Sequence, residues 1–493
     1  MPRIHILPID MFQDVAVGTT VMEALRSAGI LLDAPCGGNG KCGKCAVIVD
    51  GAEALACQTT INEDMQVLVP EGKDLHVMRA GIEIDGRVDP LCPGMLLAID
   101  IGTTSVVCFL LDGKSGEEIT SASALNPQIA FGADVITRIR EALAGKLESE
   151  RDVIRQKLTE LILEVCTAAD VDPADIGLVS VVGNPAMQQL FLGVSPENLV
   201  TIPFGPVLNE TKTVPCRDVL PVCENAQLLI VPDIAGYVGA DTLGCVLSTR
   251  MFEADELTLM VDIGTNGEMV LGNKDRMIAC STAAGPALEG ANILFGMRGS
   301  DGAIDHVTAE DGVFHCSVIG GGMAKGICGS GLIDAVAVSL EEGLLNRRGR
   351  ISSTEEIEGQ RYISLRDGIY LTQEDIRQVQ MAKGAICAGV QLMARQLGYD
   401  VTDIKRVLLA GAFGSFMDPD SACRIGLLPE ELKGRIIPVG NAAGSGAKLM
   451  ARDKAEILLA QELKDRIEFL ELASLKEFSG TFARAMNFRE TVK

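Results

Sequence analysis

Four cysteines in a glycine-rich stretch near the N-terminus constrain this chain more than any other feature. They are Cys36, Cys42, Cys45 and Cys57, with the spacing C-x5-C-x2-C-x11-C. Glycines let a backbone wrap closely around inorganic sulfide and direct N–H groups at it, which stabilises the charge of a reduced iron–sulfur cluster. The spacing is close to the plant-type C-x4-C-x2-C…C pattern, with one more residue in the first gap. We therefore predict a [2Fe-2S] cluster, which is a one-electron centre.

Other uses of these cysteines fit the pattern less well. A zinc site of four cysteines normally shows two C-x2-C pairs, whereas only Cys42 and Cys45 form such a pair here. A C-x-x-C redox motif normally lies near a βαβ pattern, and this segment is β-rich. Gly38, Gly40 and Gly43 also spell G-x-G-x-x-G. They lie between the predicted ligands and open no helix after a strand, so we do not interpret them as a dinucleotide motif.

Composition excludes several classes of function. The chain has 493 residues and a formal net charge of −24, and it lacks tryptophan. A chain this acidic has no basic patch to neutralise phosphates, so we expect no nucleic acid partner. The longest apolar run, residues 95–111, is interrupted by Asp100 and is too short to span a bilayer. We expect no membrane association.

The compartment follows from the cysteines and the N-terminus. The first residues contain no charged region followed by an apolar stretch, so no signal peptide is predicted. Fifteen cysteines in an unsecreted chain are typical of reduced thiols, and we predict a cytoplasmic protein. The eleven cysteines outside the cluster are expected in the core, because free cysteine is among the most buried residue types. An oxygen-sensitive cluster is compatible with anaerobic metabolism.

The first 71 residues have the element order of a small β-grasp ferredoxin. A Thr cap and a closing glycine mark the helix, and the cluster loop lies between that helix and the later strands. The predicted strands are residues 3–8, 14–17, 46–49, 55–59 and 65–69, and the predicted helix is 20–29. Residues 72–94 are mixed and polar, with Pro90 and Pro93 near their end, and are predicted to be a linker.

An internal repeat organises the rest of the chain. Residues 97–104 (LAIDIGTT) recur 162 positions later as residues 259–266 (LMVDIGTN). Each copy is an apolar strand that runs into Asp-Ile-Gly-Thr and is followed by another apolar strand, so one supersecondary unit is present twice. Strands alternate with helical patterns, which indicates an α/β architecture with mixed sheets. We predict a first lobe at 95–255 and a second at 256–493.

A hairpin with Asp-Ile-Gly-Thr at its tip suits phosphate. Glycine permits close approach of the backbone, hydroxyl and N–H groups donate to phosphate oxygens, and an aspartate can hold hydrated Mg²⁺. Two such hairpins across a cleft would grip one nucleotide from both sides, and we predict bound ATP and Mg²⁺. Asp100 and Asp262 are the predicted catalytic aspartates, which would hold Mg²⁺ and orient water. The predicted phosphate contacts are Gly102, Thr103, Thr104, Gly264, Thr265 and Asn266.

Two later segments are suited to the nucleoside. An apolar strand at 407–410 runs into small residues, where a base can lie flat on the backbone, and residues 441–447 open another helix. A Walker A motif is absent, because Gly40-Lys41 is followed by Cys42 where that motif needs Ser or Thr. The predicted nucleoside contacts are Gly411, Ala412, Phe413, Gly414, Asn441 and Gly444.

The water that attacks ATP needs a base or a positioning group. Asp241, Glu289 and Asp233 are candidates from their position in the chain, with helix capping or surface solvation as the alternative for each. His306 and His315 flank a predicted surface hairpin and receive no role.

These motifs resemble the superfamily of acetate and sugar kinases, heat-shock chaperone ATPases and actin. Residues 100–104 match its first phosphate motif, 262–266 the second, 411–414 the adenosine motif and 441–447 the segment that closes the site. The resemblance implies ribonuclease-H-like duplicated lobes. Combined with the N-terminal cysteine pattern, the chain resembles the ATP-dependent reductive activators of corrinoid proteins. Further stretches fit that family, at 183–187, 231–241, 283–290, 326–331 and 471–478.

This resemblance implies ATP-dependent reduction of an inactive Co(II) corrinoid protein to Co(I), which reactivates a corrinoid-dependent methyltransferase or demethylase. No Asp-x-His-x-x-Gly pattern of a base-off corrinoid site is present in the chain, so the corrinoid is expected on the partner. The resemblance also implies a homodimer. It does not identify the upstream electron donor.

Other functions remain open from the sequence. The chain could donate electrons to another low-potential enzyme such as a dehydratase, although such activators usually carry a cluster between subunits. It could be a sugar-type phosphotransferase regulated by its cluster, or a redox sensor that binds nucleotide without turnover. Fold analogy alone does not separate these functions.

Overall fold

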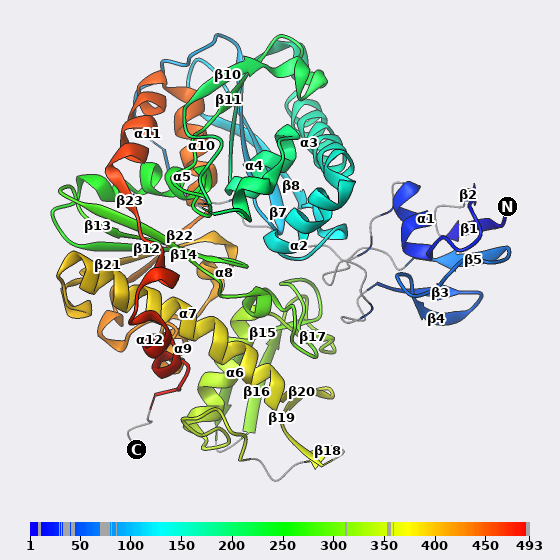
Figure 1. Ribbon diagram of the computed structural model, residues 1–493, viewed down its shortest axis with the longest axis vertical. Helices are drawn as coiled ribbons and strands as arrows, with labels where there is room; N and C mark the ends of the chain where they lie inside the picture. The colour runs from blue at the N-terminus through cyan, green and yellow to red at the C-terminus, as the bar shows by residue number, and fades with distance from the viewer. Residues whose placement is uncertain are drawn as a thin grey trace.

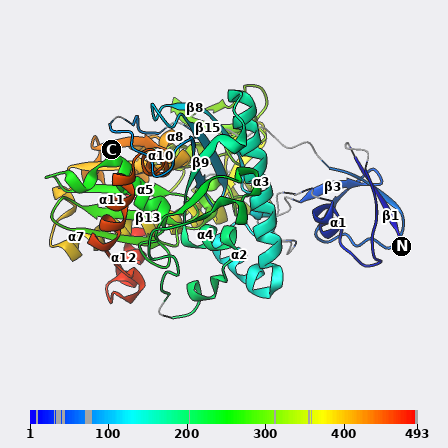
Figure 2. The same ribbon diagram turned by 90° about the horizontal axis from the view of Figure 1, so that it is seen from above.

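The computed structural model describes residues 1–7, 11–28, 30, 32, 40, 45–69, 79, 81–84, 86–202, 204–310, 313–352, 356–357 and 359–489. A small N-terminal module stands apart from a much larger body in two views of the molecule (Figures 1 and 2). The larger body has an upper and a lower part in Figure 1, with strands and helices in each. The functional residues predicted above are divided between the module and the body.

The described part of the N-terminal module is a five-stranded mixed sheet in the order β2-β1-β5-β3-β4, packed against helix α1. Glu23 accepts from the Thr20 N–H while the Thr20 hydroxyl accepts from the Glu23 N–H, a reciprocal cap that fixes the start of α1. The elements are β1 (Arg3–Leu7), β2 (Met11–Asp14), α1 (Val21–Ser27), β3 (Ala46–Val49), β4 (Ala52–Leu55) and β5 (Met65–Leu68).

Two predicted strands of this module are wrong in position. Residues 14–17 were expected to be extended, but β2 ends at Asp14, where it pairs with Arg3. Residues 55–59 were expected to be a strand, but Leu55 ends β4 and its carbonyl accepts from the N–H groups of Gln58 and Thr59. The chain therefore turns directly after β4, and this turn carries Cys57.

The first lobe is a six-stranded sheet in the order β10-β11-β9-β6-β7-β8. Strand β6 pairs antiparallel with β7 and parallel with β9. The strands are β6 (Met95–Ile101), β7 (Ser105–Leu111), β8 (Glu118–Leu125), β9 (Ile176–Gly183), β10 (Lys212–Pro215) and β11 (Gln227–Ile230). The helices are α2 (Val135–Glu141), α3 (Leu147–Ala169), α4 (Pro185–Leu192) and α5 (Ala240–Thr249).

The second lobe repeats the arrangement, with the order β22-β21-β12-β13-β14-β23. Strand β12 pairs antiparallel with β13 and parallel with β21, as β6 does with β7 and β9. The repeat in the sequence is therefore a repeat of structure, and the α/β prediction is confirmed. The strands are β12 (Thr258–Ile263), β13 (Gly267–Gly272), β14 (Met277–Thr282), β21 (Arg406–Ala410), β22 (Ile436–Gly440) and β23 (Ile467–Phe469).

Helices and a smaller subdomain complete this lobe. Its helices are α7 (Gln373–Leu397), α8 (Gly411–Phe416), α9 (Pro419–Ile425), α10 (Ala442–Arg452), α11 (Lys454–Arg466) and α12 (Phe478–Ala485). Between β14 and α7 the chain forms two three-stranded sheets and one long helix. These elements are β15 (Ala303–Glu310), β16 (Val313–Val318), β17 (Gly326–Ile327), α6 (Gly329–Glu341), β18 (Glu356–Ile357), β19 (Gln360–Arg366) and β20 (Ile369–Thr372).

Helices α5 and α10 share one hydrophobic core with both large sheets. The two helices cross at glycines, because a Cβ on Gly446 would lie 2.3 Å from the Cα of Gly244. Neither position accepts a larger residue without separating the helices. Each lobe is thus packed against the same helix pair, and both helices begin at the cleft between the lobes.

Residues 81–84 and 86 of the predicted linker lie along helix α10. The guanidinium of Arg452 donates to the carbonyls of Ile84 at 2.8 Å and Gly86 at 2.9 Å. A Cβ on Gly81 would meet the main-chain oxygen of Asn441 at 2.5 Å, so this segment also touches the start of the helix. The chain that leads to the N-terminal module therefore runs along α10.

Most of the cysteines outside the predicted cluster set lie in the hydrophobic core. Nine of the eleven cysteines outside the predicted cluster set are buried, and Cys92 and Cys316 are partly exposed. Their predicted place in the core is confirmed for those nine. Among the residues described, no helix combines the length and the apolar character needed to cross a membrane.

Candidate functional site

The two Asp-Ile-Gly-Thr hairpins face one another across a cavity of about 190 Å³. β6 and β7 form the first hairpin and β12 and β13 the second, as predicted. Residues from both lobes line this cavity, among them Asp100, Thr103, Asp262, Thr265, Gly411 and Asn441. The structure therefore brings together residues that are more than three hundred positions apart in the sequence. We refer to this cavity as the nucleotide cleft.

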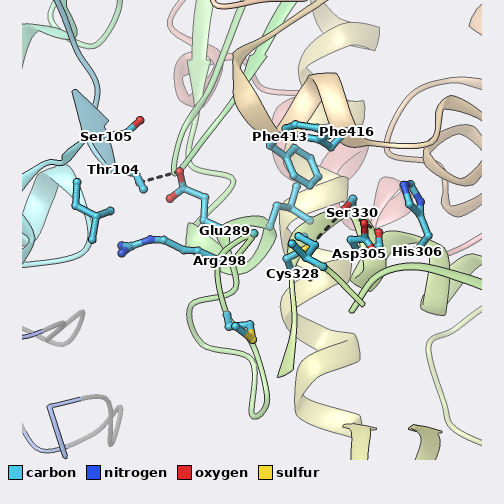
Figure 3. A pocket seen from close by; sticks show the side chains of 16 residues that line it. Thr104, Ser105, Glu289, Arg298, Asp305, His306, Cys328, Ser330, Phe413 and Phe416 are labelled. Atoms are coloured by element: carbon cyan, nitrogen blue, oxygen red, sulfur yellow. Dashed lines mark hydrogen bonds between the residues drawn. The ribbon is translucent and has the colours of Figure 1, made fainter. Parts of the chain in front are cut away.

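Glu289 connects the two hairpins across the cleft. Its Oε1 accepts from the hydroxyl of Thr104 at 2.9 Å, and its Oε2 accepts from the hydroxyl of Thr265 at 2.6 Å. Figure 3 shows the first of these contacts, with the side chain of Glu289, from the second lobe, pointing toward Thr104. The carboxylate therefore engages two of the hydroxyls that were predicted to bind phosphate.

Three aspartates of the cleft have pKa values shifted upward. Burial raises the pKa of Asp100 to about 7, and the charge of Asp241 adds to the shift. Burial followed by the charges of Asp241 and Glu289 raises the pKa of Asp262 to about 7. Burial also raises the pKa of Asp241 to about 6, although the N–H of Thr242 stabilises its carboxylate at 2.7 Å. Carboxylates that share a desolvated cleft in this way are suited to a bound cation.

Glu268 and Asn184 also line the cleft, and neither was among the predicted site residues. Glu268 lies opposite Asp262 in the β12–β13 ladder, and burial raises its pKa well above the usual value. The amide of Asn184 donates to the hydroxyl of Thr103 at 3.0 Å, while its oxygen caps helix α4. The Asn-Pro pair at 184–185 is a helix-start signal that could have marked this position. The strand sequence around Glu268 contains no comparable signal.

Asp233, the remaining candidate from the sequence, lies behind the cleft and not on its wall. Its side chain is fully buried, and Oδ1 accepts from the amide of Gln188 at 2.9 Å. Burial and the charge of Asp241 raise its pKa well above the ordinary value. Of the three candidates, Asp241 and Glu289 line the cleft and are therefore the two that can contact a nucleotide directly.

The predicted nucleoside residues fall into two groups. Gly411 and Phe413 line the cleft, and Gly411 has φ +82° with its ideal Cβ only 2.6 Å from Oδ1 of Asp262. Glycine is therefore required at that position. Gly414 packs on Leu409, and the N–H of Gly444 donates to Oδ1 of Asn441 at 2.6 Å. These two glycines support the wall from behind. The side chain of Ala412 is outside the described part.

A second cavity, of about 350 Å³, adjoins the nucleotide cleft (Figure 3). Thr104, Ser105, Glu289 and Phe413 line both spaces, so the two are adjacent. We refer to it as the side cavity. It extends from the tip of the first hairpin toward the subdomain that contains β15 and α6.

Two of the four predicted cluster ligands belong to the described residues. Cys45, directly before β3, and Cys57, in the turn after β4, are buried cysteines whose Sγ atoms lie 3.3 Å apart. That separation is well beyond a disulfide bond, and the two thiols point at one place. Cys36 and Cys42 lie outside the residues that the structure describes. The Cys45 and Cys57 pair fits a cluster site, because two thiols from separate segments converge there without a bond between them.

Over the ranges that the structure describes, no group of three or more His, Cys, Asp or Glu side chains is placed to hold a metal ion by itself. Magnesium sites in ATPases typically use one or two carboxylates together with substrate phosphates and water. Asp100 and Asp262, on opposite walls of the nucleotide cleft, match that requirement.

Family models match three consecutive parts of the chain. Residues 4–67 match the model described as "2Fe-2S iron-sulfur cluster binding domain". Residues 95–254 match the "RACo middle region", and residues 256–493 match the "C-terminal domain of RACo the ASKHA domain". The last of these is the model for an actin- and kinase-like fold, in agreement with the repeated sheets.

Individual relatives extend over nearly the whole chain. The corrinoid activation enzyme RamQ of Eubacterium limosum is 32% identical, with 97% of this chain and 98% of that protein covered. The [Co(II) methylated amine-specific corrinoid protein] reductase of Methanosarcina barkeri is 25% identical over 80% of this chain and 76% of its own length. A solved structure titled "Reductive activator for corrinoid,iron-sulfur protein" is 28% identical, covers 100% of this chain and 99% of its own, and has a TM-score of 0.74.

Proposed function

This chain belongs to the family of reductive activators of corrinoid proteins, and from that premise we propose that it uses ATP to reduce a Co(II) corrinoid protein to Co(I). It carries an iron–sulfur domain and an ATP-binding domain. The product state would restore a corrinoid-dependent methyltransferase or demethylase to its active form. The observation that carries the proposal is the presence, in one chain, of the cluster module and the two-hairpin nucleotide cleft.

Thermodynamics explains why such an activity needs ATP. Plant-type ferredoxin clusters have reduction potentials near about −400 mV. A one-electron transfer becomes about tenfold less favourable for each ~59 mV by which the acceptor lies below the donor. A ligand can shift that equilibrium only through a protein state for which it has a different affinity. The chain must therefore link its nucleotide cleft to the partner that receives the electron.

Different residues of the cleft would bind the magnesium ion and the phosphates of Mg-ATP. Asp100 and Asp262 would hold Mg²⁺, which when bound neutralises the charge of the triphosphate. The hydroxyls and N–H groups at the hairpin tips would donate to phosphate oxygens, and Asn441 would fix the Asp100 carboxylate from the side. The residues proposed for phosphate are Gly102, Thr103, Thr104, Gly264, Thr265 and Asn266.

We assign the positioning of the attacking water to Asp241. Its carboxylate lines the cleft with Asp100 and Asp262, and its pKa of about 6 leaves it largely ionised at neutral pH. Glu289 would instead hold Thr104 and Thr265 in place until phosphate oxygens replace it as their acceptor. Asp241 would then act on the attacking water, whereas Glu289 would hold the hairpin tips before the nucleotide binds.

Cys36, Cys42, Cys45 and Cys57 would hold a [2Fe-2S] cluster, which when bound supplies the single electron. The turn after β4 fixes Cys57, and the start of β3 fixes Cys45, so both thiols are set by the sheet. These positions leave the remaining two cysteines to come from the glycine-rich segment before β3.

Helix α10 supplies a route between the two sites. It begins beside Asn441 at the cleft and ends at Arg452, which binds the segment leading to the N-terminal module. A change of lobe angle on nucleotide binding would move α10 and therefore that segment, as in hinge motions of other two-lobed proteins. We propose that this movement places the cluster module against the corrinoid protein.

The partner carries the corrinoid in this proposal, and two copies of the chain form a homodimer. The direct test is anaerobic. Reduced protein, Mg-ATP and a Co(II) corrinoid protein from the same organism are mixed, and the Co(I) absorption band is followed. The proposal requires Co(I) to form with ATP and to form far more slowly without it. Equal formation with and without ATP, or none with any such corrinoid protein, would reject the function.

A further inference from the structure

The nucleotide cleft is strongly acidic. None of the described residues on its wall is a lysine or an arginine. A triphosphate with one Mg²⁺ still carries net negative charge, which the carboxylates of a desolvated cleft repel. Enzymes that cleave phosphate esters and anhydrides therefore add a lysine or arginine to the metal ion. The carboxylates that line the cleft are Asp100, Asp241, Asp262, Glu268 and Glu289.

Arg298 lies next to this acidic wall. It is the one lysine or arginine among the described residues that line the side cavity. Thr104 and Glu289 belong to the walls of both the side cavity and the nucleotide cleft. Figure 3 shows the guanidinium of Arg298 below Thr104 and Glu289, pointing toward the first lobe. A cation from the second lobe is therefore directed at the tip of the first phosphate hairpin.

The side chain of Arg298 is free to bind a ligand. It is half-buried, yet it makes no hydrogen bond or ion pair with any residue in the described ranges. Its nitrogens are not among the atoms shielded from solvent, so a ligand can reach them. The neighbouring Glu289 carboxylate already accepts from Thr104 and Thr265. The planar fork of N–H donors on Arg298, which matches a phosphate group, is thus unused.

The backbone on both sides of Arg298 is fixed. The N–H of Met297 donates to the carbonyl of Ile327 on β17 at 2.9 Å, and the carbonyl of Ser300 accepts from Ala303 at 2.9 Å. A Cβ on Gly296 would lie 2.1 Å from the carbonyl oxygen of Gly290, so the preceding turn admits only glycine there. Binding would therefore reorient the Arg298 side chain without ordering a loop, which keeps the entropic cost low.

The charge of Arg298 also acts behind the first hairpin. There the buried guanidinium of Arg138 donates to the carbonyl of Thr103 at 2.6 Å. Burial lowers the pKa of Arg138 to about 10, and the positive charge of Arg298 contributes to the shift. Arg298 is thus close enough to the hairpin tip for its charge to be felt at Thr103, one of the predicted phosphate contacts.

We propose that Arg298 donates to the terminal phosphate of ATP and stabilises the negative charge that develops there during hydrolysis. This deepens the proposed function and rests on it in taking ATP as the nucleotide. In hydrolysis, the water oxygen bonds to the terminal phosphorus, and the bond from phosphorus to the bridging oxygen breaks. The electron pair of that bond leaves with ADP, and one water proton is released. ADP lacks the group that Arg298 would contact.

A comparison of two ligands separates this role from a structural one. The full chain with its cluster is titrated anaerobically with Mg-ADP and with a magnesium complex of a non-hydrolysable ATP analogue. Because hydrogen bonds to charged groups are worth about 1.5–3 kcal/mol, Arg298→Met should bind the analogue roughly ten- to a hundredfold more weakly and ADP within about twofold of wild type. The turnover number for ATP should fall by about a hundredfold or more.

Two further variants serve as controls. Arg361→Met removes an exposed arginine of the same subdomain, on β19, and should behave as wild type in all three measurements. Arg298→Lys keeps the charge without the fork, so its affinity for the analogue should fall between those of wild type and Arg298→Met. Equal losses of ADP and analogue binding in Arg298→Met, or unchanged analogue binding, would overturn the assignment.

The failure of this assignment is distinguishable from the failure of the proposed function. Binding and hydrolysis of ATP need no corrinoid protein. ATP-dependent Co(I) formation by wild-type protein, together with wild-type analogue binding by Arg298→Met, would reject the role of Arg298 alone. A wild-type protein that binds neither nucleotide would reject both.

Discussion

The hydroxyl of Thr104 donates a 2.9 Å hydrogen bond to Glu289, which joins the tip of the first hairpin to the second lobe. The same carboxylate accepts from Thr265 on the second hairpin. One acidic side chain therefore accepts from two hydroxyls that we propose to bind phosphate oxygens. Nucleotide binding must exchange these contacts, so Glu289 opposes binding while it keeps the hairpins aligned.

Replacing Glu289 by Gln should strengthen nucleotide binding. The neutral amide holds the two threonines less strongly and no longer repels a polyphosphate, so ADP affinity should rise by roughly two- to tenfold, in the range of a single weakened charged contact. Equilibrium titration with Mg-ADP measures it. Glu253→Gln, an exposed carboxylate in the chain between α5 and β12, is the matched control and should bind as wild type. Unchanged or weaker binding by Glu289→Gln contradicts the competition.

The pKa values of Asp100 and Asp262 are both raised to about 7, which predicts that protons are released when Mg-nucleotide binds. An ordinary aspartate has a pKa near ~4 in the unfolded chain. The folded, nucleotide-free protein therefore binds more protons than the unfolded chain between these values, and its stability falls as pH rises through that window. In the proposed site these carboxylates bind Mg²⁺ in their ionised form, so Mg-nucleotide binding at pH 6.5 should release protons.

Calorimetric titration in two buffers with different ionisation enthalpies measures that release. Asp262→Asn should release fewer protons than wild type, because one titrating group is removed. The same variant should also lose part of the decline in stability between pH 5 and 7. Identical heats in both buffers for the wild-type protein would show that these carboxylates do not exchange protons on binding.

Arg452 should matter for electron delivery more than for ATP turnover. Arg452 lies outside the nucleotide cleft. Its guanidinium donates to the carbonyls of Ile84 and Gly86, and these two bonds hold the segment that leads to the cluster module against α10. Arg452→Gln loses the forked contact, so Co(I) formed per ATP hydrolysed should fall severalfold. Lys454→Met removes only the exposed ion pair with Asp89 and should change this ratio little. A proportional loss of both activities in Arg452→Gln would contradict the role of α10 in coupling.

The buried side chain of Lys383 should make the free energy of unfolding depend on pH in a second, alkaline range. Its side chain is buried on α7, its Nζ donates to the carbonyl of Asn487 at 2.6 Å, and burial lowers its pKa to about 8. The unfolded chain, with a lysine pKa near ~10.4, binds more protons between these values, so stability should rise with pH from 8 to 10. Urea unfolding of Lys383→Met should show a smaller rise. Equal slopes in the two proteins would contradict the buried-charge account.

Local patterns predicted the parts of the site that are local. Asp-Ile-Gly-Thr fixes a turn between two apolar strands, so Asp100 and Asp262 could be placed at hairpin tips from the sequence. Asn441 could be placed because it caps the start of a helix. Each of these inferences needs only a few neighbouring residues, and each lies where the structure has a matching element.

The rest depends on contacts between distant segments. Arg298 lines the side cavity because the residues before it pair with β17, and that pairing leaves no pattern in the sequence. The close crossing of α5 and α10 depends on Gly244 and Gly446, which resemble ordinary helix glycines until the helices are brought together. The slip of strands 14–17 and 55–59 has the same origin, since pairing with β1 and β3 decides where those strands end.

We propose that ATP hydrolysis moves an electron that the cluster alone could not deliver. The most direct measurement is the solution potential at which half of the corrinoid protein becomes Co(I), with the activator present and the potential set by mediators. With Mg-ATP turning over, this potential should become less negative than with Mg-ADP, and Asp262→Asn should remove the difference while the visible spectrum of the cluster stays unchanged. The same half-reduction potential with ATP and with ADP would contradict the account.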